Sequence, residues 1–197
     1  KQYRRVLDEG NPQTNNVLGL IGNKHTVDWT RYHDVDWFEE IRSGVKPALL
    51  QDLAARATTF PASFTLHRQV QKIMDDRREM TAGQLMVDWG FAETLAYASL
   101  LEEGYEIRLT GQDSGRGTFF HRHAVGHDQG TGATHIPLKH LKPGQPRFRV
   151  TDSLLSEEAV LGFEYGYSIT DPNCLVIWEG QFGDFANGAQ VIIDQFI

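Results

Sequence analysis

The feature that most constrains the fold is an alternation of helical and strand-like segments in the second half of the sequence. A helical pattern with one apolar side covers residues 88–103 and ends at Gly104, a common residue just after a helix. An alternating segment follows at 105–110, and further strand candidates occur at 147–151 and 175–178. Strands separated by helices indicate a parallel sheet with right-handed crossovers. The sequence therefore predicts an α/β fold with a mainly parallel sheet flanked by helices.

The segments that follow the predicted strands are where a ligand is expected. Helices are predicted at 156–168 and from residue 187 onward. In open sheets of this kind, ligands bind beyond the carboxyl ends of the strands. The three segments that leave those ends, 111–123, 152–158 and 179–187, should therefore converge at one edge of the sheet.

The first part of the chain has a different character. We expect residues 1–80 to be a connector and helical lead-in, and residues 81–197 to be the start of the α/β domain. Helices are predicted at 3–9, 47–58 and 66–80, and the last of these has apolar residues on one side with Arg and Asp opposite. No catalytic signature occurs in this part, which favours a scaffolding role.

Composition limits the classes of partner. The formal net charge of −7 gives no electrostatic reason to expect nucleic acid or an anionic membrane as a ligand. No apolar run approaches the roughly 20 residues of a membrane helix. A single cysteine, Cys174, cannot form an internal disulfide, which favours a reducing compartment. The sequence has no initiator Met, and residues 191–197 look like a helix without a stop signal, so we expect a piece of a longer polypeptide.

The segment 111–123 is rich in chemistry-bearing residues. Three glycines, Arg116 and two histidines after a strand could cradle an anion, or could form a plain tight turn; both interpretations stay open. Five of the eight histidines fall between His121 and His140. His121 and His123 share a face if the chain is extended, but no cysteine or obvious third ligand accompanies them. Hydrogen-bonding or acid–base roles are therefore favoured over a metal site.

Glu157 is the carboxylate whose position in the sequence best fits a role in ligand binding. Ser156 can cap a helix, and an acidic residue in the first turn then needs no further explanation. A carboxylate at the end of a strand–helix loop also points into the ligand crevice, where it could share a proton with a ring nitrogen. Phe182 and Phe185 follow the next strand, and an exposed Phe there could stack on a flat ring or could belong to the core.

Three motifs together carry a resemblance to a known family. They are Gly-Gln-Asp-Ser-Gly-Arg-Gly-Thr-Phe-Phe-His-Arg-His from residue 111, Leu-Ser-Glu-Glu-Ala-Val-Leu-Gly-Phe-Glu-Tyr-Gly-Tyr from 155, and Trp-Glu-Gly-Gln-Phe-Gly-Asp-Phe-Ala-Asn-Gly-Ala-Gln from 178. In order and spacing they resemble the thiamine-diphosphate-dependent decarboxylating component of the 2-oxoglutarate dehydrogenases, in the transketolase-like superfamily. Each motif alone is a weak signal.

The resemblance implies specific roles. Glu157 matches the family glutamate that hydrogen-bonds the aminopyrimidine ring and shifts its tautomer, which activates the cofactor. Phe185 matches the aromatic residue that stacks on the pyrimidine. His121 and His123 are assigned to contacts with the substrate or intermediate. The other expected contacts with the cofactor are Gln112, Leu155, Gln181 and Phe182.

The resemblance also implies an activity and partners. The family decarboxylates 2-oxoglutarate and passes the succinyl group to a lipoyl group on dihydrolipoyl succinyltransferase. It works as a homodimer, in the bacterial cytoplasm or the mitochondrial matrix. Its magnesium is held by a Gly-Asp-Gly…Asn type motif in another domain. No such motif occurs in this sequence, so we expect no metal site in this chain.

Two alternatives stay open. The chain could belong to another thiamine-diphosphate 2-oxo-acid dehydrogenase, although the Phe-Gly-Asp-Phe-Ala-Asn-Gly run differs from those enzymes. It could instead be a non-catalytic scaffold for dimerisation or for docking of the lipoyl partner, an interpretation favoured by the aromatic stretch 29–38.

Overall fold

The chain separates into two compact units, residues 1–39 and residues 40–197. The computed structural model describes residues 27–33, 35–36, 38–181 and 184–197. In the first unit these include one turn of 3-10 helix, η2 (Thr30–Tyr32), where Trp29 packs edge-on against Tyr32 with ring centroids 6.0 Å apart. The helix predicted at 3–9 lies outside the described residues.

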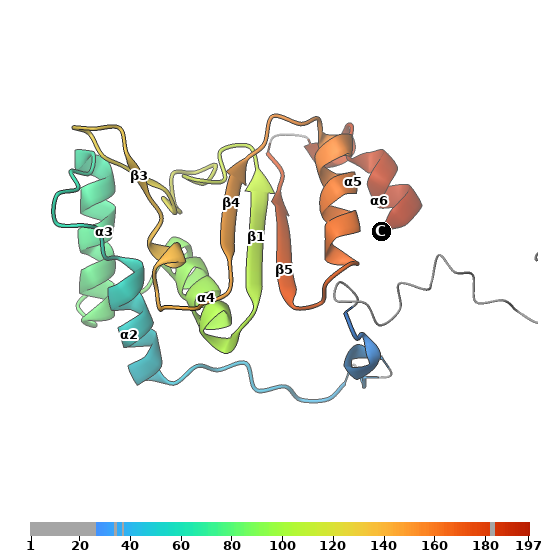
Figure 1. Ribbon diagram of the computed structural model, residues 1–197, viewed down its shortest axis with the longest axis horizontal. Coiled ribbons are helices and arrows are strands. Elements are labelled where there is room, and N and C mark those ends of the chain that lie inside the picture. Colours follow the sequence, from blue (N-terminus) through green and yellow to red (C-terminus); the bar gives the residue numbers. More distant parts are fainter. Residues whose placement is uncertain (1–26, 34, 37, 182–183) are drawn as a thin grey trace, which may run out of the picture. The chain divides into compact units, whose positions relative to one another are not determined.

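A parallel sheet organises the second unit. Its strands, in spatial order, are β4 (Phe148–Asp152), β1 (Glu106–Gly111) and β5 (Cys174–Glu179) (Figure 1). β1 lies in the centre and pairs in parallel with both neighbours, so that Gly111 stands opposite Asp152 on one side and Glu179 on the other. The predicted α/β class, a parallel sheet flanked by helices, is confirmed.

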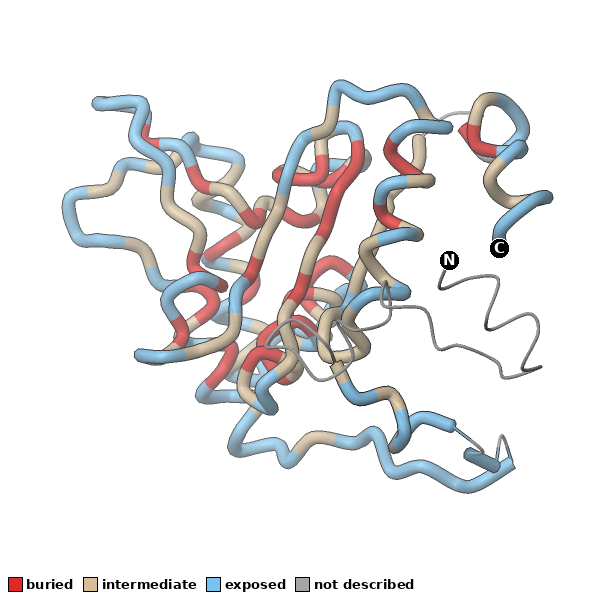
Figure 2. The backbone as a smooth tube through the Cα atoms, turned by 45° about the vertical axis from the view of Figure 1, so that its right-hand side comes forward, coloured by how far each residue is buried: buried red, intermediate tan, exposed pale blue. Residues whose placement is uncertain are grey.

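Helices cover both faces of this sheet. Along β1, Ile107 and Leu109 are buried in a core shared with α4 (Trp89–Glu103), whereas Arg108 between them reaches Glu164 of α5 (Glu157–Ser168). Since successive strand residues point to opposite faces, α4 and α5 lie on opposite sides of the sheet. Buried residues follow β1 and the helices beside it (Figure 2).

The other elements of this unit are shorter or lie beside the sheet. They are α2 (Pro47–Ala57), α3 (Arg68–Thr81), β2 (Gly126–His127), β3 (Thr134–His135), η3 (Pro137–Lys139), η4 (Asp184–Ala186) and α6 (Gln190–Phe196). The helices predicted at 47–58 and 66–80 are thus confirmed to within a few residues, whereas the β2–β3 hairpin was not predicted. No helix in the described part of the chain is long and apolar enough to cross a membrane.

One charged residue of α3 is buried. Arg77 follows Val70 by seven residues on the apolar side of the helix, and only 3% of its surface is exposed. Its guanidinium donates to two backbone carbonyls of the segment after β1, and this contact explains why a charged side chain faces inward. The predicted boundary after residue 80 between lead-in and domain stays a prediction.

The start of α4 fits tightly against the segment after β1. Asp88 caps the helix, its Oδ1 accepting from Phe91 N at 2.7 Å. A Cβ atom at Gly90 would lie 2.5 Å from the carbonyl oxygen of His121. Glycine at position 90 therefore allows the helix backbone to approach this segment more closely than any side chain would permit.

A buried ion pair joins the central strand to α5. Arg108 Nε and Nη2 donate to the two carboxylate oxygens of Glu164, at 2.6 and 2.8 Å, and the Glu164 side chain is 4% exposed. The guanidinium also lies over the Tyr167 ring, 4.9 Å from its centroid. The hydrogen bond that Arg108 donates to Glu164 is the main cause that raises the pKa of Arg108.

Removing one partner of this pair should be costly. Arg108→Leu leaves the Glu164 carboxylate buried without its counter-ion, and we expect a loss of about 3 kcal/mol in the free energy of unfolding, measured by urea titration. The double variant Arg108→Leu/Glu164→Leu removes both charges and should recover most of the loss. Equal stability of the single and double variants would contradict this account.

Two helical glycines should respond to alanine in opposite directions. Gly166 of α5 has open space where a Cβ would go, so Gly166→Ala should raise stability by roughly 0.5–1 kcal/mol through helix propensity. Gly90→Ala forces a backbone shift against His121 and should lower stability by about 1–3 kcal/mol. Thermal unfolding of both variants measures the difference, and a stabilising Gly90→Ala would disprove the close approach.

Candidate active site at the carboxyl edge of the sheet

The three segments that leave the strands meet at one edge, as predicted. Ser153 N, after β4, donates to Gly111 O at the end of β1, at 2.8 Å. Gly115 N donates to Asp152 Oδ1 at 2.8 Å. After β5, Gln181 Nε2 donates to the carbonyl oxygen of Gln112 at 3.0 Å. The parallel register makes these contacts possible because all three strands end at the same level.

Glu157 begins α5 at this edge. Ser156 caps the helix, its Oγ accepting from Ala159 N at 3.4 Å, as the sequence predicted. Glu157 is partly buried, whereas the neighbouring Glu158 is exposed. Within the described part of the chain, no side chain or backbone group forms a hydrogen bond or ion pair with the Glu157 carboxylate. The positive end of the helix dipole favours its charged form.

A shallow cavity adjoins this carboxylate. Its volume is about 10 Å³, room for roughly one water molecule. It brings together three of the predicted cofactor-contacting residues, Gln112, Leu155 and Glu157. The complete lining is Gly111, Gln112, Ser153, Leu155, Glu157, Val160, Trp178 and Asp184. A Cβ at Gly188 would lie 3.1 Å from Glu157 Oε2, so glycine there keeps that oxygen uncovered.

The segment after β5 is fastened beside this cavity. Gln181 is predicted to contact the cofactor, and its amide Nε2 also lies 3.2 Å from both Asp113 Oδ2 and Thr118 Oγ1. Its backbone N donates to the buried Asp184 at 2.7 Å. Phe182 lies outside the described residues, and for Phe185 only the backbone position in η4 is described. Their predicted contacts with the ring stay predictions.

His121 and His123 do not share one cavity. His121 Nε2 lies 3.6 Å from Glu93 Oε2 on α4, and its ring packs so tightly on Gly117 that a Cβ there would lie 2.5 Å from Cε1. His121 Nδ1 is buried and has no hydrogen-bond partner among the described residues. His123 has a positive φ of 44° and lines a different cavity. The segment is not extended, so the expectation of a common face fails.

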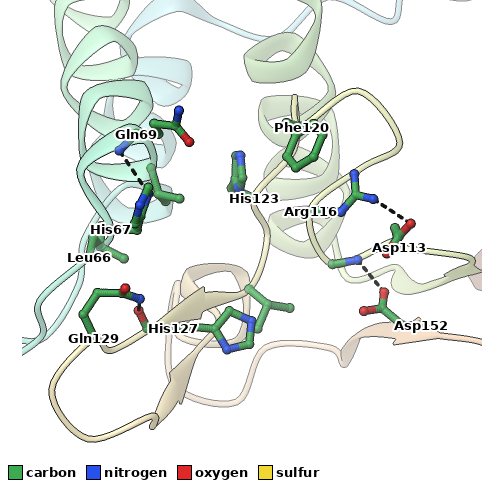
Figure 3. Close-up of a pocket in the computed structure, with 13 residues that line it drawn as sticks. Leu66, His67, Gln69, Asp113, Arg116, Phe120, His123, His127, Gln129 and Asp152 are labelled. Carbon is green, nitrogen blue, oxygen red and sulfur yellow. Dashed lines mark hydrogen bonds and ion pairs between the residues drawn. The ribbon is translucent and has the colours of Figure 1, made fainter.

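The cavity that His123 lines is much larger, about 400 Å³, within the usual range for small-ligand sites. Figure 3 shows His123 between His67, at the start of α3, and Arg116 with Phe120 on the loop. The full lining is Leu66, His67, Gln69, Val70, Asp113, Gly115, Arg116, Phe120, His123, Val125, His127, Gln129 and Asp152. Burial, and next the nearby Arg77 cation, lower the pKa of His123.

Sequence reasoning missed His67 and His127 as neighbours of this cavity. His127 follows His123 by four residues, and the histidine-rich stretch was a usable signal for it. His67 lies far away in sequence, and only the fold brings it near; its Nδ1 accepts from Gln69 N at 3.3 Å as the cap of α3. Among the described residues, no group of three His, Cys, Asp or Glu is arranged to hold a metal ion.

A buried ionic network supports the whole edge and was also missed. Arg122, 4% exposed, donates to Glu93 of α4 at 2.8 Å, to Glu179 at the end of β5 at 2.5 Å, and to Ser114 O at 2.9 Å. Burial disfavours the Arg122 cation, but the hydrogen bonds that it donates to Glu179 and Glu93 outweigh burial and raise the pKa of Arg122. One side chain thus ties the loop after β1 to a helix and to a second strand.

The donors and acceptors at this edge suit a flat heteroaromatic ring. The Glu157 carboxylate can accept a hydrogen bond or share a proton, the Gln112 side chain can donate or accept, and Leu155 offers an apolar surface. The cavity beside Glu157 has room for roughly one water molecule, so these residues alone do not enclose such a ring.

Comparison with known proteins agrees with this architecture. Residues 86–197 match the family described as "Transketolase, pyrimidine binding domain". The "2-oxoglutarate dehydrogenase E1 component" of Haemophilus influenzae is 51% identical over 195 residues, which is 99% of this chain and 21% of that protein. The protein of the same name from Coxiella burnetii is 52% identical over 195 residues, with the same coverage.

A third relative matches a shorter stretch. The "Oxoglutarate dehydrogenase" of Buchnera aphidicola is 57% identical over 145 residues, 74% of this chain and 16% of that protein. The chain thus spans about a fifth of the length of the relatives that it matches most fully. The family match runs from just before α4 to α6 and includes all three parallel strands and the edge at which Glu157 lies. The chain therefore belongs to the transketolase pyrimidine-binding domain family.

Proposed function

We propose that the chain is the pyrimidine-binding part of a 2-oxoglutarate dehydrogenase, an enzyme that decarboxylates 2-oxoglutarate and transfers the succinyl group to a lipoyl group on a partner succinyltransferase. The names of its relatives support this substrate. The observation that carries the proposal is the Glu157 carboxylate, which is partly buried at the carboxyl edge of the sheet and has no partner in the described part of the chain. An unpaired carboxylate at that edge is available to a ligand.

The proposed cofactor is thiamine diphosphate, with its aminopyrimidine ring against the wall formed by Gln112, Leu155 and Glu157. When bound, this cofactor supplies the electron sink that decarboxylation requires. Gln181 supports the wall through its hydrogen bond to Gln112 O. Phe182 and Phe185 are proposed to complete the pocket, with Phe185 stacking on the ring.

Glu157 is proposed to exchange a proton with a ring nitrogen of the pyrimidine. Glu157 lies in the first turn of α5, and Leu155 and the buried Val160 line the cavity beside it. A carboxylate in this position can accept a hydrogen bond from a ring nitrogen and exchange its proton. Glu158 is exposed and is not proposed to take part.

His121 and His123 are proposed to contact the substrate or a later intermediate. They point to different surroundings, His121 toward Glu93 and His123 into the 400 Å³ cavity, so we assign them to different groups of the reactant. The lowered pKa of His123 favours a neutral imidazole, which can accept a proton or donate a hydrogen bond near neutral pH.

The rest of the site is proposed to come from outside this chain. Magnesium and the diphosphate would be held by another domain, and the family works as a homodimer in which the cofactor lies between subunits. The cavity beside Glu157 supports this division because, at about 10 Å³, it is far too small to enclose the cofactor. The cytoplasm is the proposed compartment; the half-buried Cys174 thiol, its pKa raised to about 11 mainly by burial, suits a reducing environment.

Two other functions compete with this one. Another 2-oxo-acid dehydrogenase of the same cofactor class would keep Glu157 but take a different substrate. A dimerisation or docking scaffold would keep the fold without catalysis. The rate of turnover of 2-oxoglutarate, compared with the rates for pyruvate and branched-chain 2-oxo acids, distinguishes the proposed function from the first alternative. The activity of a Glu157 variant distinguishes it from the scaffold.

Glu157→Gln in the complete enzyme should reduce decarboxylation of 2-oxoglutarate by about two orders of magnitude or more, because the amide cannot exchange the proton. Glu158→Gln, the neighbouring and exposed carboxylate, is the matched control and should keep near-normal turnover. Release of carbon dioxide is the measurement, with circular dichroism as a check on folding. Near-normal turnover by Glu157→Gln would leave only the scaffold.

The isolated 197-residue chain should bind thiamine diphosphate weakly, with or without magnesium, because the diphosphate carries most of the ligand charge and no metal-holding group is present among the described residues. Isothermal titration calorimetry of the chain and of the complete enzyme gives the comparison. Tight, magnesium-dependent binding by the chain alone would overturn the proposed division of the site.

A further inference from the structure

Arg77 of α3 carries a buried charge that faces the His121–His123 loop, defined as residues 121–123. Its residue exposure is 3%, and one nitrogen, Nη2, donates to His121 O and to Arg122 O, each at 2.9 Å. Within the described part of the chain, no carboxylate is in ion-pair contact with it, and its Nε has no hydrogen-bond partner. Burial accordingly lowers the pKa of Arg77.

Packing alone does not account for this arginine. Its guanidinium lies 5.5 Å from the centroid of the Phe91 ring, and Nη1 is 4.0 Å from Met74 Sδ, so the surroundings are largely apolar. A methionine of similar length would fill this space without the desolvation of a cation. What the arginine adds is the pair of hydrogen bonds to consecutive carbonyls of the loop.

The same loop is held from its other side. Arg122 N and His123 N both donate to Arg116 O, at 3.0 and 3.1 Å. Arg77 therefore donates to the carbonyl oxygens of His121 and Arg122. The carbonyl oxygen of Arg116 accepts from the backbone amides of Arg122 and His123. His123 adopts a positive φ of 44°, a conformation that non-glycine residues maintain only where their surroundings enforce it. The two sets of hydrogen bonds supply that enforcement.

The first turn of α3 faces the loop that these hydrogen bonds hold in place. His67, Gln69 and Val70 line the 400 Å³ cavity across from His123 (Figure 3). Because His67 Nδ1 accepts a hydrogen bond from Gln69 N, its neutral ring carries the proton on Nε2. α3 thus lines the cavity with its first turn and, further along, holds the loop through the hydrogen bonds of Arg77.

We propose that Arg77 is a positioning residue for His121 and His123, and that α3, which precedes the region matched by the family, is an integral part of the active centre. This inference rests on the proposed function only in naming the substrate. The fastening of the loop is independent of which 2-oxo acid is consumed.

The charges around His123 provide a signature of this role. The groups that face it are Arg77 from α3, the neighbouring His121, and the titratable or charged residues that line the cavity, which are His67, Asp113, Arg116, His127 and Asp152. After burial, Arg77 is the largest influence that lowers the pKa of His123. Loss of the Arg77 charge should therefore raise that pKa, and this shift reports that Arg77 acts on His123 in the folded enzyme.

Arg77→Met in the complete enzyme is the decisive variant. We expect kcat/KM for 2-oxoglutarate to fall by about tenfold to a hundredfold, through both a lower kcat and a higher KM, since small displacements of positioned groups have effects of this order. The dissociation constant for thiamine diphosphate should stay unchanged because its proposed contacts lie at Glu157. Arg77→Lys keeps the charge and one donor, and it should recover part of the activity.

Arg78→Met is the matched control. Arg78 is the next residue of the same helix, is exposed, and contacts Asp75 and Thr58 O rather than the loop. It should retain wild-type kcat/KM. The pH dependence of His123 modification by diethylpyrocarbonate, followed by peptide mass spectrometry, should shift to higher pH in Arg77→Met and stay in place in Arg78→Met and Arg77→Lys.

The outcomes separate the two proposals. Wild-type kcat/KM and an unshifted His123 profile in Arg77→Met would overturn the positioning role. A parallel loss of thiamine diphosphate affinity and thermal stability in Arg77→Met, with no recovery in Arg77→Lys, would also overturn it in favour of a structural role. If the wild-type enzyme did not consume 2-oxoglutarate, the proposed function would fail, while turnover of the 2-oxo acid that it does consume, together with the His123 profile, would still decide the role of Arg77.

Discussion

The parallel pairing of β1 with both β4 and β5 is the constraint on which the rest of the structure depends. It ends three strands at one level, with Gly111 between Asp152 and Glu179. The segments that follow therefore have to meet, and their first hydrogen bonds join residues that are far apart in sequence. A one-residue slip in either pairing would move Asp152 or Glu179 out of reach of the loop, because side chains alternate between faces along a strand.

At this edge of the sheet, buried charged side chains hold the segments together, whereas elsewhere apolar packing does so. Arg122 joins α4 and β5 to the loop, and Arg77 holds the same loop from α3. Burying two guanidinium groups is unfavourable unless hydrogen bonds offset the loss of water, so the carbonyl groups that both arginines bind have to stay in place. The core under the sheet, centred on Ile107 and Leu109, has no such directional demand. Positional precision is thus concentrated where the reaction is proposed to occur.

Much of the fold was open to prediction from the sequence, because periodicity and caps are local signals. The strand at Glu106–Gly111 and the cap at Ser156 were each read from a few neighbouring residues. Arg77 shows where such reasoning stops: a buried cation has no local signal, and only its acceptors, more than 40 residues away, explain its burial. His67 is missed for the same reason. The positive φ of His123, which separates it from His121, also has no local signal.

The two cavities of the site share a wall, and this links the proposed roles. Gly111, Gln112 and Ser153 face the shallow cavity beside Glu157, whereas Asp113, Gly115 and Asp152 face the larger one beside His123. A few consecutive residues of two segments therefore separate them. The hydrogen bond from Gly115 N to Asp152 joins those segments, and Gln181 fastens Gln112 from the third.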